Sequence, residues 1–436
     1  MNRKIKTITT LALALVLGMG IFGESVVKAK KAKDAATVTG KAMKITKKSR
    51  VSEDEMTGEY KDFSLRALKE AVSLEEEGKN IMISPASLMF ALDMAAMGAK
   101  GKTYSQIASL YNKNATKKDL MTFAKNYRKT LEDSGMIDIA NSIWINENNL
   151  TQNNIKVNEE YLNLLRKHFK AAAASRKFSE AVKDEINAWI SKKTKGMIPQ
   201  TLDKLSQKTL MLIINAMAFE GKWKEEYQDY QINENGKFTN YAGETETAKM
   251  LLSEENLYFE TSSEKGFLKY YEGNKYAFLA ILPKDSGISV NEYVAGLSDE
   301  AFTNIMNSIY STEVDTVTPA FTFDYSIVMN DMLKNLGMKK AFNASADFSL
   351  LLSADSRDAG FPVYIGSVIQ KTHIELDEKG TKAAAVTVID VEDGACPEPD
   401  FEERKEVILN RPFVFAIMDM EKQTPVFEGV VNTLES

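Results

Sequence analysis

One segment near the C-terminus begins with the alternating pattern of a strand and continues with the acidic composition of a loop, and this combination restricts the folds that the chain can adopt. From Thr381 to Asp393 the side chains alternate, with charge mostly at even positions and small or apolar side chains at odd positions. Successive side chains on a strand point to opposite faces, so this alternation predicts a half-buried β-strand. From Asp390 to Glu406 the sequence is acidic and contains Pro397 and Pro399, which predicts an exposed loop. A potential strand therefore runs directly into a loop.

The residues at the start of this segment point to a known family. Glu378-Lys379-Gly380-Thr381 contains a flexible glycine, and Ala383-Ala384-Ala385 follows it with little side-chain bulk. Together they resemble the hinge of the inhibitory serpins. The resemblance implies an exposed reactive loop at about 378–410, which begins at a hinge formed by Glu378, Gly380, Thr381, Ala383, Ala384 and Ala385.

Two motifs earlier in the chain carry the same resemblance. In Ser84-Pro85-Ala86-Ser87, the serine can cap a helix and the proline fits its first turn. The apolar run 210–219 predicts a strand covered on both faces, and Gly221-Lys222-Trp223 follows it. These segments resemble the start of the second serpin helix, a central strand and the turn after it. The resemblance implies that the loop enters the sheet at Trp223.

A polar cluster beneath the main sheet is also implied, formed by Ser84, Ser87, Asn215 and Gln370. Asn215 has a second interpretation as an ordinary buried amide, since any buried polar group must form hydrogen bonds. Gln370 stands where many serpins have histidine. Glutamine keeps the donor and acceptor roles without titrating, so we expect sheet opening to be independent of histidine protonation here.

The resemblance extends over nearly all of residues 58–436, which we expect to form one serpin domain. Length alone is also compatible with two domains, but no repeat or Gly/Pro/Ser-rich linker divides the chain. The implied fold class is α+β, with a large mixed or antiparallel main sheet, two smaller sheets and about eight or nine helices.

The N-terminal end indicates export. Residues 1–29 resemble a signal peptide, with a basic start and an uncharged run (Leu11–Gly23) that is shorter than the roughly 20 residues of a membrane span. An uncleaved anchor is the alternative. Residues 30–57 are rich in Lys, Ala, Thr and Ser and predict a flexible tether. We therefore expect a secreted or cell-surface protein without stable membrane insertion after cleavage.

Composition argues against several other functions. The net charge of −6 does not suggest nucleic-acid binding, and no phosphate loop or metal-spaced His/Cys cluster occurs. The single cysteine, Cys396, and His373 are conceivable as a nucleophile and base. However, Cys396 precedes a proline in a charged loop with no obvious fixed base. The sequence thus favours a monomeric protein that is not an enzyme and needs no cofactor or metal.

The expected partner is a protease. The resemblance implies inhibition of a serine endopeptidase, or possibly a cysteine endopeptidase, by covalent trapping with insertion of the cleaved loop into the main sheet. The family spacing counted from Glu378 places the attacked bond at Gly394–Ala395, with a shift of one or two residues as the alternative. Glu392 and Asp393 disfavour trypsin-like enzymes and leave an elastase-like or subtilisin-like target, whereas Arg404 lies too far along for normal insertion. A secreted binding protein that is cleaved without trapping remains the alternative function.

Overall fold

The structure is a computed structural model that describes residues 41–45, 48–207, 209–298, 300–357, 359–381 and 404–435. Its helices include three of six residues or fewer, α5, α10 and α11. Helices this short do not complete two turns and leave no apolar repeat in the sequence, so the described ranges hold more helices than the expected eight or nine. The α-helices are α1 (Glu53–Leu74), α2 (Pro85–Gly98), α3 (Gly101–Ala108), α4 (Lys117–Glu132), α5 (Glu147–Gln152), α6 (Glu159–Phe169), α7 (Glu180–Lys193), α8 (Val290–Gly296), α9 (Ala301–Ser308), α10 (Asn330–Asn335) and α11 (Ala354–Arg357).

The described strands form two hydrogen-bonded sheets, one of nine strands and one of seven. The seven-stranded sheet is mixed, because β12 pairs in parallel with β4 and antiparallel with β11. The nine-stranded sheet holds the remaining strands in one continuous network, which confirms the α+β class. The strands are β1 (Ile81–Ile83), β2 (Ile137–Asn146), β3 (Ala172–Arg176), β4 (Met211–Phe219), β5 (Gly221–Lys222), β6 (Ile232–Thr239), β7 (Thr245–Glu260), β8 (Glu264–Tyr270), β9 (Tyr276–Pro283), β10 (Tyr310–Pro319), β11 (Phe321–Val328), β12 (Ser367–Leu376), β13 (Gly380–Thr381), β14 (Lys405–Ile408), β15 (Phe413–Asp419) and β16 (Thr424–Val431).

Helix α2 connects the two sheets through the core. All of its residues are buried, as expected for a helix that is apolar on every side, and it packs against β2 and β4 of one sheet and β16 of the other. Its N-terminus is formed as the sequence predicts: the hydroxyl of Ser84 accepts a hydrogen bond from the backbone N–H of Ser87, and Pro85 occupies the first turn. This cap places Ser84 and Ser87 directly against the seven-stranded sheet.

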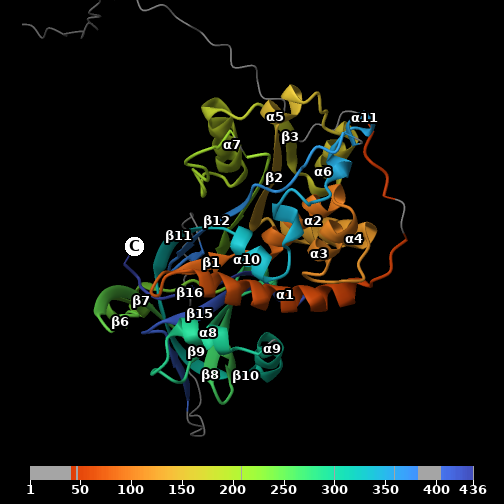
Figure 1. Cartoon of the computed structure of the whole chain (residues 1–436). Helices are drawn as coiled ribbons and strands as arrows, with labels where there is room; N and C mark the ends of the chain where they lie inside the picture. The colour runs from red at the N-terminus through yellow and green to blue at the C-terminus, as the bar shows by residue number, and fades with distance from the viewer. Residues whose placement is uncertain are drawn as a thin grey trace, which may run out of the picture. The chain divides into compact units, whose positions relative to one another are not determined.

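Helix α1, which runs horizontally across the view of Figure 1, packs against β16, and the Tyr60 hydroxyl donates to the carbonyl of Pro425 over 2.7 Å. The helix begins at Glu53, inside the range 30–57 that the sequence analysis assigned to a tether. Ser52 caps its first turn, which contains three acidic residues, as favoured near the positive end of a helix. These acidic residues interrupt the apolar repeat, so the early start is not evident from the periodicity.

The part of residues 30–52 that the structure describes contacts the folded chain. The backbone N–H of Met43 donates to the carbonyl of Glu160 in α6 over 2.8 Å. The backbone N–H of Arg50 donates to the Asp119 carboxylate over 3.0 Å, and the Ser49 hydroxyl binds the same carboxylate. Among the described helices, none is both long and apolar enough to cross a membrane.

A buried carboxyl in β16 makes stability depend on pH. Glu428 is fully buried, and within the described ranges neither of its carboxyl oxygens has a hydrogen-bond partner. Burial raises the pKa of Glu428 to about 8. The native carboxyl therefore keeps its proton at pH values where the unfolded one, with a pKa of about 4.3, has lost it. Between these two pKa values the native state binds more protons, so the free energy of unfolding falls as pH rises, by about 1.4 kcal/mol per pH unit.

We expect Glu428→Gln to be more stable than the wild type near neutral pH and to lose this part of the pH dependence. Urea unfolding from about pH 5 to about pH 8 measures it. Asp93 is also fully buried with a pKa raised to about 8, so part of the wild-type slope should remain in the variant. An unchanged slope in Glu428→Gln would contradict the assignment to Glu428.

Candidate functional site

The two central strands of the seven-stranded sheet separate toward their carboxyl ends. Strands β4 and β12 pair in parallel between 212–216 and 367–371. Further along, Leu376 of β12 pairs with Thr381 of β13, and β13 in turn pairs with β5, which follows directly after β4. The residues Gly380 and Thr381 thus lie between the ends of the separated strands. Both pairings of β13 are antiparallel, the direction that a strand entering between β4 and β12 would need.

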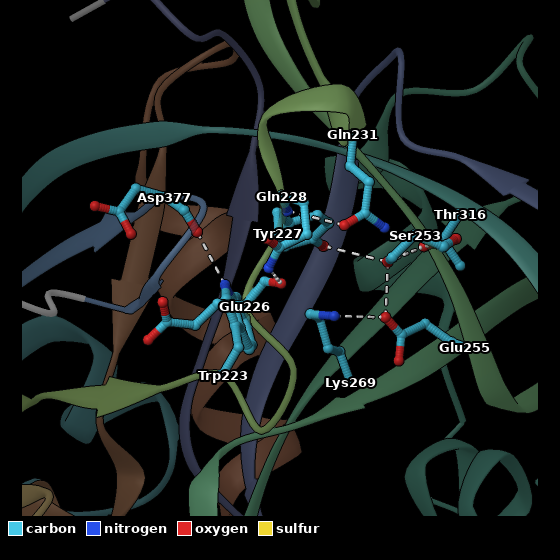
Figure 2. Close-up of polar contacts among 10 residues, drawn as sticks. All are labelled: Trp223, Glu226, Tyr227, Gln228, Gln231, Ser253, Glu255, Lys269, Thr316 and Asp377. Atoms are coloured by element: carbon cyan, nitrogen blue, oxygen red, sulfur yellow. Dashed lines mark hydrogen bonds and ion pairs between the residues drawn. The ribbon is translucent and has the colours of Figure 1, made fainter. Parts of the chain in front are cut away.

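Backbone hydrogen bonds hold the segment before β13 in place. The backbone N–H of Trp223 donates to the carbonyl of Lys379 over 3.0 Å, and that of Tyr227 donates to the carbonyl of Glu378 over 3.0 Å. The indole N–H of Trp223 donates to the carbonyl of Asp377 over 2.9 Å (Figure 2). Three consecutive carbonyls, from Asp377 just before the hinge to Lys379, are therefore bound by two aromatic residues. Trp223, which the resemblance places at the loop entry, lies at this point.

Thr381 is already inside the protein. Its side chain is 2% exposed, and its hydroxyl shares a 2.8 Å hydrogen bond with the hydroxyl of Tyr271. The ring of Tyr271 stacks on Trp223 with 4.5 Å between centroids. At position 380 a side chain would place its Cβ 2.2 Å from the carbonyl oxygen of Gly221, so only glycine allows this approach.

An ion pair anchors the first residue of the hinge. The Lys249 ammonium lies 2.7 Å from the Glu378 carboxylate. Partial burial raises the pKa of Glu378, but the hydrogen bond and charge of Lys249, a backbone hydrogen bond and the charge of Lys379 together outweigh it and leave the pKa below its usual value. The same hydrogen bond raises the pKa of Lys249. The pair is thus charged on both sides at neutral pH.

The four residues of the expected polar cluster lie together in the structure. Gln370 accepts from the backbone N–H of Ser84 over 2.9 Å and donates to the carbonyl of Ser84 over 2.9 Å and to the Asn215 side chain over 3.2 Å. The Asn215 amide also bonds with the hydroxyl and the carbonyl of Ser87. Gln370 and Asn215 are register partners across β12 and β4. The cluster therefore connects both strands to the N-terminus of α2.

Gln370→Leu should destabilise the native protein by about 2–3 kcal/mol, because it leaves the buried backbone N–H of Ser84 without its partner and removes a donor from the Asn215 side chain. The carbonyl of Ser84 also loses a donor but keeps the backbone N–H of Leu88. The measurement is the midpoint and slope of urea unfolding. Lys371→Leu, one position along on the partly exposed face, is the matched control and should cost less than about 1 kcal/mol. A loss in Gln370→Leu no larger than in this control would show that the amide does not support the cluster.

Several contributors are not evident from the sequence. Asn141 of β2 accepts from the Asn215 amide over 3.0 Å, and its polar neighbours in an alternating strand are the only sequence signal for it. Lys249, Tyr227 and Tyr271 reach the hinge from segments with no motif of their own. The predicted hinge residues Ala383, Ala384 and Ala385, together with Gly394, Ala395 and Cys396, lie outside the described residues.

Of the two residues considered for catalysis, His373 and Cys396, only His373 lies within the described residues. His373 of β12 lies 2.9 Å from the carboxylate of Asp324 on the adjacent strand β11. Within the described ranges, no group of three or more His, Cys, Asp or Glu side chains is placed to hold a metal ion.

Comparisons with known proteins agree with this architecture. The family profile described as serpin (serine protease inhibitor) matches residues 59–434. Neuroserpin of Gallus gallus is 27% identical over 379 residues, covering 81% of this chain and 86% of its own. An uncharacterised serpin-like protein of Methanosarcina mazei is 29% identical over 366 residues, covering 81% of each chain.

A solved structure gives the same result. The thermophilic serpin tengpin in its native state is 36% identical and superposes with a TM-score of 0.79, covering 90% of this chain and 97% of its own. Tengpin in its latent state superposes with a lower TM-score of 0.73 at 34% identity, covering 89% and 100%. The chain belongs to the serpin family.

Proposed function

We propose that the protein inhibits a serine or cysteine endopeptidase by covalent trapping coupled to insertion of its own loop. The observation that carries the proposal is the position of Gly380 and Thr381, which pair with β12 and β5 where β12 and β4 separate. Serpins are typically protease inhibitors rather than enzymes, which supports the same conclusion. Insertion of a loop into a sheet is an established way for serpins to use strand addition.

In this mechanism the protease attacks the Gly394–Ala395 bond and forms an acyl-enzyme. The loop upstream of the bond then extends the antiparallel pairing that β13 has begun. About fourteen residues at roughly 3.3 Å each would carry the attached protease roughly 45 Å. Such a displacement distorts the protease before the ester is hydrolysed, and the energy comes from a native state held away from its most stable packing.

The test is incubation with a panel of serine and cysteine proteases that includes elastase-like and subtilisin-like enzymes. Trapping should give a covalent band on denaturing gels, and the mass of the released C-terminal peptide should identify the bond. Clean cleavage without such a band would replace the proposal with a serpin that is cut but does not trap. A peptide that does not begin within two residues of Ala395 would reject the assigned bond and leave trapping intact.

We also propose that the inhibitor acts outside the cell or at its surface. The basic, uncharged and small-residue sections of residues 1–29 support this localisation. Fractionation of the producing cells and N-terminal sequencing of the mature protein test it. Retention in the cytosol with an intact N-terminus would contradict the proposal.

A further inference from the structure

A buried ion pair lies beside the residues that bind the hinge. Lys269 is in β8 and Glu255 is in β7, and the ammonium is 2.7 Å from the carboxylate (Figure 2). The two side chains are 6% and 13% exposed. Within the described residues this carboxylate is the only one paired with Lys269.

The Lys269 ammonium also contacts two aromatic rings. It lies 4.4 Å from the ring centroid of Tyr227 and 5.6 Å from that of Trp223. These are the residues whose backbone N–H groups bind the hinge carbonyls of Glu378 and Lys379. A cation over an aromatic face attracts the ring, and this attraction strengthens when water is excluded. The ion pair therefore reaches the hinge through one intermediate layer of residues, Trp223 and Tyr227.

The position of Glu255 is itself fixed. The hydroxyl of Ser253 donates to the same carboxylate oxygen over 2.7 Å. That hydroxyl also shares a 2.9 Å hydrogen bond with the hydroxyl of Thr316 on the adjacent strand β10 (Figure 2). A carboxylate held in this way gives the ammonium one preferred location between the two rings.

Stability alone does not explain such a pair. A buried ion pair often stabilises a protein no more than apolar side chains of similar volume, because both charges lose their hydration. The contacts of the ammonium with Trp223 and Tyr227 instead suggest a role in placing these two residues.

We infer that Lys269 and Glu255 are positioning residues for loop insertion. The pair holds Trp223 and Tyr227 in place, these two hold the carbonyls of the hinge, and the hinge keeps Thr381 seated against β12. Insertion after cleavage starts from this seated hinge, so loosening the pair slows insertion and gives the protease more time to hydrolyse the ester. The inference rests on the proposed trapping function.

The test compares variants by the stoichiometry of inhibition, the number of inhibitor molecules consumed per trapped protease. The double variant Lys269→Met with Glu255→Gln removes both charges together and leaves neither buried alone. We expect its stoichiometry to rise about threefold or more. It should also convert more slowly to the loop-inserted form when warmed uncut, since both processes begin from the seated hinge. Lys269→Arg keeps the cation and should remain close to the wild type.

A matched control is the pair Lys284 and Glu260, whose charged groups lie 2.6 Å apart and about one-third exposed. Lys284→Met with Glu260→Gln makes the same change in charge without touching Trp223 or Tyr227 and should leave the stoichiometry unchanged. If the hinge-side double variant matches this control, the inference is wrong. A lower melting temperature with unchanged stoichiometry and faster conversion would assign the pair to stability only.

Two further measurements test the inference if the double variant does not fold or if the wild type traps no protease. If the double variant does not fold, Ser253→Ala retains both charges and removes the hydroxyl that bonds to Glu255, to Thr316 and, over 3.5 Å, to the hydroxyl of Tyr227. Its stoichiometry should rise by a smaller factor, and a wild-type value would contradict the inference. If the wild type traps no protease, hydrogen exchange of the Trp223 and Tyr227 amides still reports on the hinge. Exchange about tenfold faster in either variant supports positioning, and equal exchange rejects it.

Discussion

Thr381→Arg should abolish covalent trapping and turn the protein into an ordinary substrate. Thr381 is 2% exposed and bonds to the buried hydroxyl of Tyr271, so arginine at this position would have to bury a charge beside β12 with no partner. Such burial costs several kcal/mol, and a few kcal/mol slows insertion about a hundredfold or more. Hydrolysis of the acyl-enzyme would then outpace insertion.

The measurement is the amount of SDS-stable complex formed with a protease that the wild type traps, together with the yield of cleaved protein. Thr381→Ser is the matched control, because it keeps the small size and the hydroxyl and should trap like the wild type. A stable complex with Thr381→Arg at wild-type yield would mean that the mechanism does not require a small, uncharged residue seated at this position.

Cleavage within the reactive loop should raise the melting temperature by more than about 10 °C. Among the described residues, β13 provides two residues of this antiparallel pairing. A cut releases the following residues, which can then pair along both β4 and β12 and add backbone hydrogen bonds on two sides. For a domain of roughly 380 residues each kcal/mol gained raises the melting temperature by about 1 °C, so the expected shift corresponds to about 8 kcal/mol or more from the whole inserted strand.

Differential scanning calorimetry of intact and cleaved protein checks this expectation. A cut introduced away from the loop, in the exposed turn around Gly243, provides the control and should not raise the melting temperature. Equal melting temperatures before and after loop cleavage would show that the uncut protein does not store the free energy that the proposed mechanism requires.

The parts of the site that follow from the sequence are those with local patterns. The cap at Ser84 and the buried run of β4 are visible as short motifs. Their resemblance to one family also brings in Gln370, which is distant in sequence. The structure places Gln370 beside Ser84 and Asn215, because register pairs it with Asn215 and the cap presents the backbone of Ser84.

The parts that do not follow depend on pairing between distant strands. Nothing near Lys249 indicates that it reaches Glu378, because the contact depends on how β7 passes the end of the seven-stranded sheet. Lys269 lies in a strand that also contains Glu264 and Lys265, and the partner that allows its burial lies on the adjacent strand β7. Long-range ion pairs have no periodic signature, and only the assembled sheet shows them.

The β4–β12 ladder spans only five register pairs, and Gln370 with Asn215 lies inside it. A strand that enters from the hinge would break the hydrogen bonds of this short ladder and form new ones with β4 and with β12. Because Gly380 and Thr381 are already paired in the resting protein, the free-energy barrier to insertion is set by opening of the β4–β12 ladder and not by pairing of the first residues. Substitutions within the β4–β12 ladder should therefore change the rate at which the uncut protein converts spontaneously to the loop-inserted form.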